Sequence, residues 1–577
     1  MMATLSLPQR FPVVVSADMP SASMYAAQQL SSYFSRMDGY SHPVVEQCDG
    51  IGLRIKTNLS FPGGAFRLII SENKCLLEAG TPAGHVYGAY ALLEKAGCRF
   101  LAQDCEIIPQ GSIVLPQGVF EEHPAFEVRE LFWREAMDGE FAVKLRLNSA
   151  RSSITPQQGG KAMFYNFSHT FNQLVPVEKY FDSHPEYFSI INGKRLKERT
   201  QLCLTNPDVF QLCLEGVRKW IRENPDYSIF SVAMNDWYNA CQCPSCRAID
   251  EREESGAGTM IKFVNAIADE IEKDYPHVKL HTFAYLYCRK PPKYTKPRSN
   301  VIVRLCSIEC CFAHPLHSCG CETGPIDVQY GSAKAFSGDP HTESTFLRDL
   351  RNWTGWCDNL YIWDYTTNYA NYLQPFPNLD ALAENIRLFR SAGVHGVFEQ
   401  GNFAHGRCSA LGQLKIYLLA KLLWNPDLDT EMLEEEFADG YYGPAARPMR
   451  DYIRLWHIGH EALHAGIYDP PNAAYLSDER LTMAEQYLKD ALAISCGTIY
   501  QERIEREALS IRYVRLAQEL PSAEGHSEAV DAFAVDVKRL GITELFERRH
   551  LDDSFEALRT CHLTQDRSRV RAISYPI

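Results

Sequence analysis

The stretch "YSIFSVAMND", residues 227–236, places an apolar run directly before the polar pair Asn235 and Asp236. Short apolar runs of this kind, bounded by polar residues, are typical of buried strands in a parallel sheet. The run therefore predicts a core strand whose carboxyl end presents Asn235 and Asp236. Where the other strands of the same sheet lie decides what these two side chains meet.

Seven more short apolar runs share this pattern, several of them separated by helical patterns such as residues 258–275 and 378–393. They are "AFEVRELFW" (125–133), "KLRLNS" (144–149), "AMFYNFSH" (162–169), "VKLHTFAYLY" (278–287), "NVIVRLCSIE" (300–309), "NLYIWDYT" (359–366) and "GVHGVFEQG" (393–401). About eight strands alternating with helices predict an α/β fold, and a (β/α)₈ TIM barrel fits better than an open sheet.

The flanking regions have different patterns, so three domains are predicted. Residues 1–122 alternate strand and helix patterns in a small α/β domain, and residues 123–430 form the barrel. Residues 431–577 carry apolar residues at three- and four-residue steps, which indicates an α-helical C-terminal domain. We expect this helical region to have a structural role, with a homo-oligomer contact as an alternative.

Composition and charge limit the classes of partner. The apolar fraction of 45% and charged fraction of 23% are those of a globular enzyme or binding protein, and the net charge is −14. An acidic surface repels phosphate backbones and anionic membranes, so neither nucleic acid nor membrane is expected as a partner. The first residues show no secretory signal pattern, which predicts a cytoplasmic protein.

Acidic residues follow the predicted strands. Asp236, Glu309, Asp364 and Glu399 end the fourth, sixth, seventh and eighth runs. Active sites of these barrels lie at the carboxyl ends of the strands, so the four carboxylates are expected to converge on one face. Taken singly, each of them is more often a helix cap or an ion-pair partner, and the group as a whole favours catalysis.

Aromatic residues beside these acids indicate the substrate. Aromatic rings cover the apolar face of a sugar while carboxylates meet its hydroxyl groups, so a carbohydrate partner is predicted. The predicted substrate-binding residues are Trp133, Arg134, His169, Asn235, Trp237, Tyr285, Glu309, His314, Trp363, Asp364, Tyr365 and Asn402.

Two carboxyl groups are expected to cleave a glycosidic bond, one as a general acid and one as a nucleophile or base. Asp236 is predicted as the acid because Trp237 beside it shields it from water. Glu399 is predicted as its partner, and Glu309 or Asp364 could exchange roles with it. This chemistry needs no cofactor and no catalytic metal.

Several blocks of the chain resemble a known family. They are "SVAMNDWYNACQCPSCRAID", "YPHVKLHTFAYLYCRKPPK", "NVIVRLCSIECCFAHPL", "NLYIWDYTTNYANYLQPFPNL", "GVFEQGN" and "LLAKLLWNPDLD". In this order they look like the bacterial domain of unknown function 4838, which largely corresponds to glycoside hydrolase family 163. The preceding "AGHVYGAYALLEKAGCRFLAQDCEIIP" is similar to the small α/β domain of hexosaminidase-like and α-glucuronidase-like hydrolases.

The resemblance implies a barrel glycosidase, and family 163 implies an endo-β-N-acetylglucosaminidase acting on N-glycans. Such enzymes are thought to use the substrate's own acetamido oxygen in place of a protein nucleophile, an exception to the two-carboxylate scheme. On this reading Asp236 is the acid/base, and Asn235 or a nearby carboxylate steadies the acetamido group. Glu399 is then not required as a nucleophile.

Two other functions remain open. An α-glucuronidase-like exo-glycosidase would need basic side chains for the substrate carboxylate, and Arg134 and Arg304 are the strand-associated candidates. A non-catalytic barrel would bind glycans without turnover, although Asp236 and the other strand-end acids argue against it.

Cys241, Cys243 and Cys246 are close enough in sequence to share one zinc ion, but a closed structural site wants four ligands. Five cysteines are candidates for the fourth: Cys203, Cys310, Cys311, Cys319 and Cys321. A disulfide and buried free thiols are the alternatives. None of these makes the cysteines catalytic, because no histidine lies near them in sequence.

Overall fold

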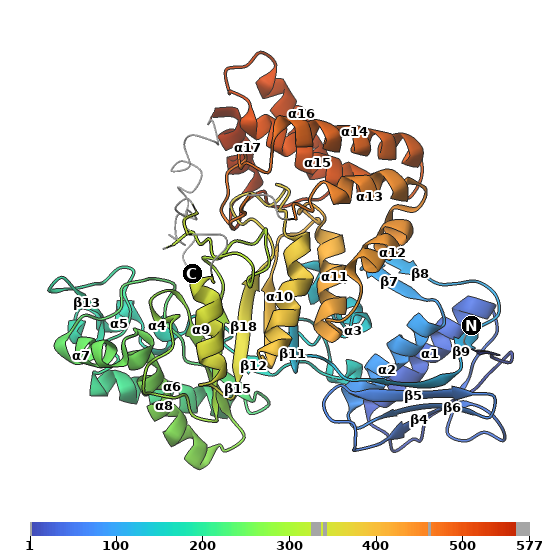
Figure 1. Ribbon diagram of the computed structural model, residues 1–577. Coiled ribbons are helices and arrows are strands. Elements are labelled where there is room, and N and C mark those ends of the chain that lie inside the picture. The colour runs from blue at the N-terminus through green and yellow to red at the C-terminus, as the bar shows by residue number, and fades with distance from the viewer. Residues whose placement is uncertain (1–2, 325–335, 339–342, 460–462, 561–577) are drawn as a thin grey trace.

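The computed structural model describes residues 3–324, 336–338, 343–459 and 463–560 (Figure 1). Two separate sheets and a C-terminal group of helices organise these residues. Within this part of the chain, no helix combines the length and the apolar character that crossing a membrane requires.

The first sheet has six strands in the order β10-β5-β6-β4-β2-β3. They are β2 (Val13–Val14), β3 (Val44–Val45), β4 (Leu53–Thr57), β5 (Phe66–Ser71), β6 (Lys74–Ala79) and β10 (Gly118–Glu122). β5 is antiparallel to both neighbours, and the other pairs are parallel. Helices α1 (Ser21–Asp38) and α2 (Pro82–Lys95) pack on one face, where alternate residues of β5 are buried (Figure 1).

Two short pairings complete this region. β1 (Thr4–Ser6) pairs with β9 (Val114–Pro116), and β7 (Arg99–Ala102) forms a hairpin with β8 (Cys105–Ile107). The hairpin contacts the later helices α11 (Gly412–Trp424) and α12 (Thr430–Tyr442), so it joins the first sheet to the rest of the molecule.

The second sheet is curled, and all its pairs are parallel, in the order β11-β19-β18-β17-β16-β15-β12. Its strands are β11 (Val128–Phe132), β12 (Phe164–Tyr165), β15 (Ile229–Ser231), β16 (Lys279–Ala284), β17 (Val301–Cys306), β18 (Leu360–Tyr365) and β19 (Gly396–Gln400). Helices α6 (Pro207–Glu223), α8 (Ala257–Asp274), α9 (Thr345–Thr354), α10 (Leu379–Ser391) and α11 (Gly412–Trp424) lie between strands or follow the last one. All six residues of β17 are buried, as expected for a parallel strand covered on both faces.

The prediction of eight strands needs one correction. Residues 144–149 contain no strand: α3 (Gly139–Lys144) ends there and Arg146 takes a positive φ of 58°, which strand geometry excludes. Asn148 nevertheless bridges the two edge strands. Its backbone N–H donates to Arg129 of β11, and its carbonyl accepts from Ala162, shortly before β12. The described sheet is therefore seven-stranded, with an irregular segment between its edges.

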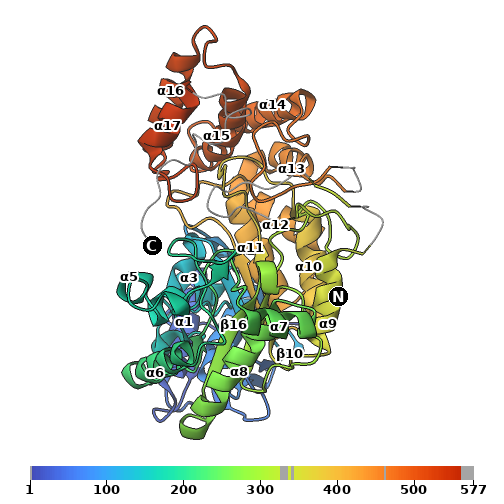
Figure 2. The same ribbon diagram turned by 90° about the vertical axis from the view of Figure 1, so that its left-hand side faces the viewer.

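The C-terminal helices stack on one another, with α13 to α17 at the top of Figures 1 and 2 and α12 below them. They are α12 (Thr430–Tyr442), α13 (Ala446–Arg454), α14 (Asp478–Ser495), α15 (Gln501–Gln518), α16 (His526–Arg539) and α17 (Leu551–Thr560). The loops between them reach the segment after β18. Tyr369 donates its backbone N–H to Ile467 and accepts one from Glu547, and Tyr372 donates to Leu545. The helical region thus covers the carboxyl ends of the strands.

Candidate active site

A cavity of about 210 Å³ lies at the carboxyl ends of the parallel strands. Every strand of the curled sheet, or the loop directly after it, contributes to its wall. The lining side chains are Phe132, Arg151, Phe167, Ser168, His169, Asp236, Phe283, Tyr285, Cys306, Ile308, Trp363, Tyr365, Tyr369, Phe398, Gln400, Ile467, Tyr468, Glu547 and Arg548. Its floor is aromatic, because Trp363 contacts the rings of Phe167, Phe283 and Phe398.

Asp236 points its carboxylate into this cavity from the loop after β15. The phenol of Tyr285 donates a hydrogen bond to Oδ1 of Asp236 at 3.0 Å, and Nε2 of His169 lies 3.7 Å from the same oxygen. Nδ1 of His169 lies 2.6 Å from the carbonyl of Met234, and it carries the hydrogen because a carbonyl can only accept. With its side chain 37% exposed, Asp236 can meet a ligand.

The loop is held on both sides of Asp236. The side chain of Gln201 donates to the carbonyls of Asn235 and Trp237 at 2.8 and 2.7 Å, and accepts from the N–H of Asn235 at 2.9 Å. Three bonds from one side chain fix the backbone at Asp236. Sequence reasoning missed Gln201, which follows no strand and forms no motif.

Asn235 faces the protein and not the cavity, which corrects its predicted role at the acetamido group. Its Nδ2 donates to the carbonyl of Thr200 at 2.9 Å, and its Oδ1 accepts from the N–H of Asn172 at 3.1 Å. Both ends of the amide are therefore bonded to backbone, and the side chain is buried. Trp237, next along the loop, does not line the cavity either.

Strand alternation separates the predicted strand-end residues. Successive side chains on a strand point to opposite faces. Trp363 and Tyr365 line the cavity, so Asp364 between them lies on the opposite face, where the Ser307 hydroxyl donates to it. In the same way Phe398 and Gln400 line the cavity and Glu399 does not.

Glu399 is therefore corrected as the catalytic partner of Asp236. It is 1% exposed, and its Oε2 has no hydrogen-bond partner among the described residues. Burial, and secondarily the Asp364 carboxylate, raises the pKa of Glu399 well above its ordinary value. Burial also raises the pKa of Asp364, to about 6. Because both acids lie on the face of the sheet away from the cavity, we expect them to affect stability and not bond cleavage.

We expect Glu399→Gln to retain turnover and to raise the melting temperature at neutral pH by roughly one or two degrees. A carboxyl group whose pKa is raised on folding binds more protons in the native state, so its contribution to stability is lost as pH rises above its ordinary pKa. The amide does not titrate. In thermal melts, the increase in melting temperature caused by Glu399→Gln should therefore grow between pH 4 and pH 8. Loss of turnover with an unchanged melting profile would contradict the placement of Glu399 away from the cavity.

The remaining predicted residues lie outside the cavity. Glu309 is buried and accepts from Arg289 at 3.0 Å, and Asn402 donates to Ser409 at 3.1 Å. Trp133 is buried against Gly401, where any side chain would overlap its ring.

Arg134 lies over the ring of Phe403. His314 belongs to a cluster of cysteines and histidines. Of the two arginines considered for an acidic sugar, neither lines the cavity: Arg304 is 1% exposed among five aromatic rings beneath the floor.

The C-terminal helical region supplies part of the cavity, which sequence reasoning did not anticipate. Glu547 and Arg548 come from the segment between α16 and α17, and Ile467 and Tyr468 from the segment before α14. Glu547 therefore lines the cavity as a second carboxylate, in addition to Asp236. No strand precedes these residues and no motif includes them, so no sequence signal marked them.

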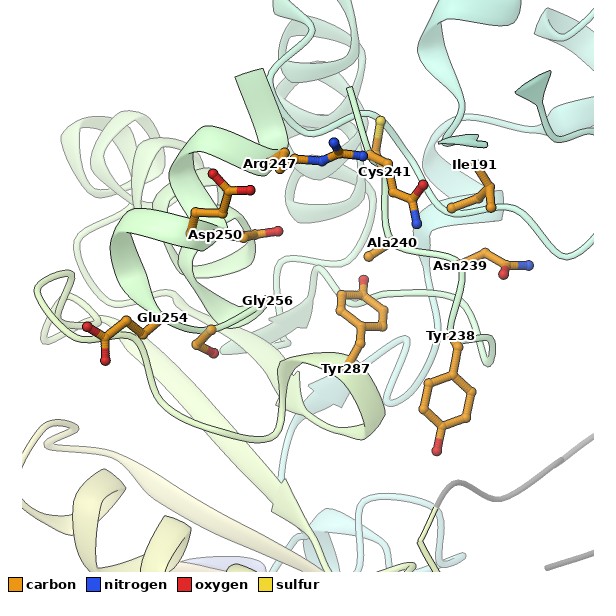
Figure 3. A pocket seen from close by; sticks show the side chains of 13 residues that line it. Ile191, Tyr238, Asn239, Ala240, Cys241, Arg247, Asp250, Glu254, Gly256 and Tyr287 are labelled. Carbon is orange, nitrogen blue, oxygen red and sulfur yellow. The ribbon is translucent and has the colours of Figure 1, made fainter. Parts of the chain in front are cut away.

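A second and more open hollow, of about 600 Å³, lies beside α7 (Pro244–Glu253) (Figure 3). It is lined by Tyr238, Tyr287, Arg247 and the acids of α7. None of its lining residues also lines the strand-end cavity. Asp250 there already accepts from the hydroxyl and N–H of Thr259. We assign the site to the strand-end cavity because it joins a positioned carboxylate to a floor of aromatic rings.

Sequence comparison places the chain in a family. Residues 100–454 match the family described as "Domain of unknown function (DUF4838)", and the chain belongs to this family. No curated protein sequence matches it.

The structure is similar to solved structures of several glycosidases. A family GH115 4-O-methyl-α-glucuronidase, with specificity for decorated arabinogalactans, superposes with a TM-score of 0.55 at 11% identity, covering 93% of this chain and 77% of that one. A Flavobacterium johnsoniae chitobiase gives 0.48 at 10% identity, covering 96% of each chain. A Bacteroides fragilis β-N-acetylhexosaminidase gives 0.43 at 11% identity, covering 79% of this chain and 93% of that one. At these identities the first similarity shows a common fold.

Proposed function

We propose that this protein is a glycoside hydrolase that cleaves a glycan containing an N-acetylhexosamine, as an endo-β-N-acetylglucosaminidase of family 163. The observation that carries the proposal is Asp236: a carboxylate held by Tyr285, partly open to solvent, above an aromatic floor at the strand ends. In this proposal the curled seven-stranded sheet, whose edge strands are bridged by Asn148, takes the place of the predicted eight-stranded barrel.

In the proposed reaction, Asp236 donates a proton to the glycosidic oxygen as the bond to the anomeric carbon breaks. The carbonyl oxygen of the substrate's acetamido group attacks the same carbon and forms a cyclic oxazolinium ion. Water then opens this ring while the Asp236 carboxylate takes the proton of the water. The configuration is retained, and the acid is regenerated.

In this scheme Glu547 acts through its negative charge and not as a nucleophile. A carboxylate in the cavity stabilises the positive charge that develops on the sugar and its acetamido nitrogen. The aromatic floor around Trp363 provides a face on which the ring of the sugar stacks.

The proposal is tested with nitrophenyl glycosides and intact N-glycans, with the products identified by mass spectrometry. We expect cleavage of the glycan at an internal N-acetylglucosamine linkage and competitive inhibition by a thiazoline analogue of the oxazolinium ion. Glycan binding without turnover on any substrate would favour the non-catalytic alternative. Turnover that the thiazoline does not inhibit would exclude the substrate-assisted route.

An α-glucuronidase-like activity is the second candidate, and two cavity residues favour it. Arg151 and Arg548 both line the cavity and offer guanidinium groups to a substrate carboxylate. Activity on uronic acid glycosides, reduced in Arg151→Gln, would establish this alternative.

A further inference from the structure

Four cysteines gather at one point beside the loop that carries Asp236. They are Cys203, Cys241, Cys243 and Cys246, and their sulfur atoms all lie within 4.8 Å of one another. Of the five fourth ligands considered from the sequence, the structure selects Cys203. Cys243 caps the N-terminus of α7, and its sulfur accepts the N–H of Cys246 at 3.4 Å.

The spacing of these sulfurs matches a metal site. A zinc ion holds thiolates at about 2.3 Å in a tetrahedron, which sets neighbouring sulfurs about 3.8 Å apart. The sulfurs of Cys203 and Cys243 are 3.7 Å apart, far beyond the roughly 2.05 Å of a disulfide bond. Together the four cysteines offer four ligands, as a closed structural site requires.

Hydrogen-bond donors surround the sulfurs, as the outer shell of a thiolate site requires. The Thr205 hydroxyl lies 3.6 Å from the sulfur of Cys243 and 3.3 Å from that of Cys246. Arg195 approaches the sulfur of Cys241 at 3.9 Å and brings a positive charge. Cys241 also lines the hollow beside α7, and in Figure 3 its sulfur points away from Tyr287.

We propose that Cys203, Cys241, Cys243 and Cys246 bind one structural zinc ion. These cysteines form a small core of their own with Ile190, separate from the main core. The ion would join residues 200–205 to the loop of residues 235–246, the same two segments that Gln201 connects on either side of Asp236. The zinc contributes to folding of this region and touches no reacting atom.

A second cluster of possible metal ligands joins the curled sheet to the C-terminal region. It consists of Cys311, His314, Cys319 and His464, whose nearest ligand atoms again lie within 4.8 Å of one another. Sulfur and nitrogen ligands of one tetrahedral zinc are about 3.6 Å apart. Here Nδ1 of His464 lies 3.4 Å from the Cys311 sulfur and 3.8 Å from the Cys319 sulfur.

We infer a second zinc site at this cluster, of the two-cysteine, two-histidine type. Nδ1 of His314 lies 3.5 Å from the Cys311 sulfur, and three of the four residues are buried. The Phe312 N–H donates to Ala465, so the two segments already meet through backbone. Because Ile467 and Tyr468 follow His464 closely, this ion would fix one wall of the strand-end cavity.

Metal analysis of the full chain tests both sites. After dialysis against a chelator, we expect two zinc ions per chain by inductively coupled plasma mass spectrometry, and one in Cys243→Ser or Cys319→Ser. The matched controls Cys48→Ser, half-buried like Cys243, and Cys310→Ser, buried beside Cys311, should keep both ions.

The unaltered protein gives an answer even if these variants do not fold. Refolding with cobalt(II) should produce thiolate-to-cobalt charge-transfer bands and the visible bands of tetrahedral cobalt. Metal-free protein whose cysteines react rapidly with a thiol reagent in the native state would overturn both sites. An intact mass lower by four hydrogens, with no metal and with both bonds mapped to these four cysteines by peptide mass spectrometry, would show two disulfides in place of the first site.

Discussion

Asp236→Asn should reduce turnover of an unactivated glycan by at least about a hundredfold, and up to ten-thousandfold, while glycan binding persists. The amide keeps the shape of the side chain and can still accept from Tyr285, but it has no acidic proton for the glycosidic oxygen. Steady-state kinetics with glycan and with nitrophenyl substrates measure the effect. The loss should shrink with good leaving groups, because they depart without protonation.

A matched control separates chemistry from folding. Asp208→Asn changes an exposed acid in the first turn of α6 that does not line the cavity, and it should leave turnover unchanged. Full activity of Asp236→Asn on an unactivated glycan would remove Asp236 from the mechanism, and the same loss on every substrate would argue against an acid role.

Glu547→Gln should lower turnover on the order of a hundredfold, with little rescue by a good leaving group. Its carboxylate is the second one in the cavity, and the proposed role is to stabilise developing positive charge, which an amide does poorly. The effect is measured by determining kcat and KM separately with N-acetylglucosaminides, for this variant and for the unaltered protein. A fall in kcat at constant KM indicates an interaction made in the transition state.

Glu544→Gln is the control for this variant. Glu544 lies three residues earlier in the same segment and accepts the Arg548 N–H at 3.1 Å, but it does not line the cavity. If Glu544→Gln is as inactive as Glu547→Gln, the effect arises from the shape of the segment and not from charge in the cavity.

The sequence predicted the parallel α/β sheet because each of its buried strands reads as a short apolar run between helices. It failed at residues 144–149, where alternating Leu145 and Leu147 suggest a strand but pack into the core from an irregular segment. Local pattern does not distinguish these two arrangements, since Leu145 and Leu147 would be buried in either one, and the burial of Arg146 between them is set by tertiary packing.

Residues of the candidate site could be predicted from the sequence only where they lie at the end of a predicted strand or directly after it. Asp236, His169, Tyr285, Trp363 and Tyr365 all line the cavity. The period of two along a strand would have shown that Asp364 cannot share a face with Trp363, nor Glu399 with Gln400. Glu547 could not be found this way, since only tertiary packing brings a loop between two late helices to the strand ends.

The family match ends at residue 454, yet the wall of the cavity does not. Ile467, Tyr468, Glu547 and Arg548 all fall beyond that limit. If the helical region were exchanged between two relatives, the positions of Glu547, Arg548 and Tyr468 in the cavity wall would all change together. Every strand of the sheet would stay the same. Under the proposed function, we therefore expect sugar selectivity to depend partly on residues that lie outside the matched segment.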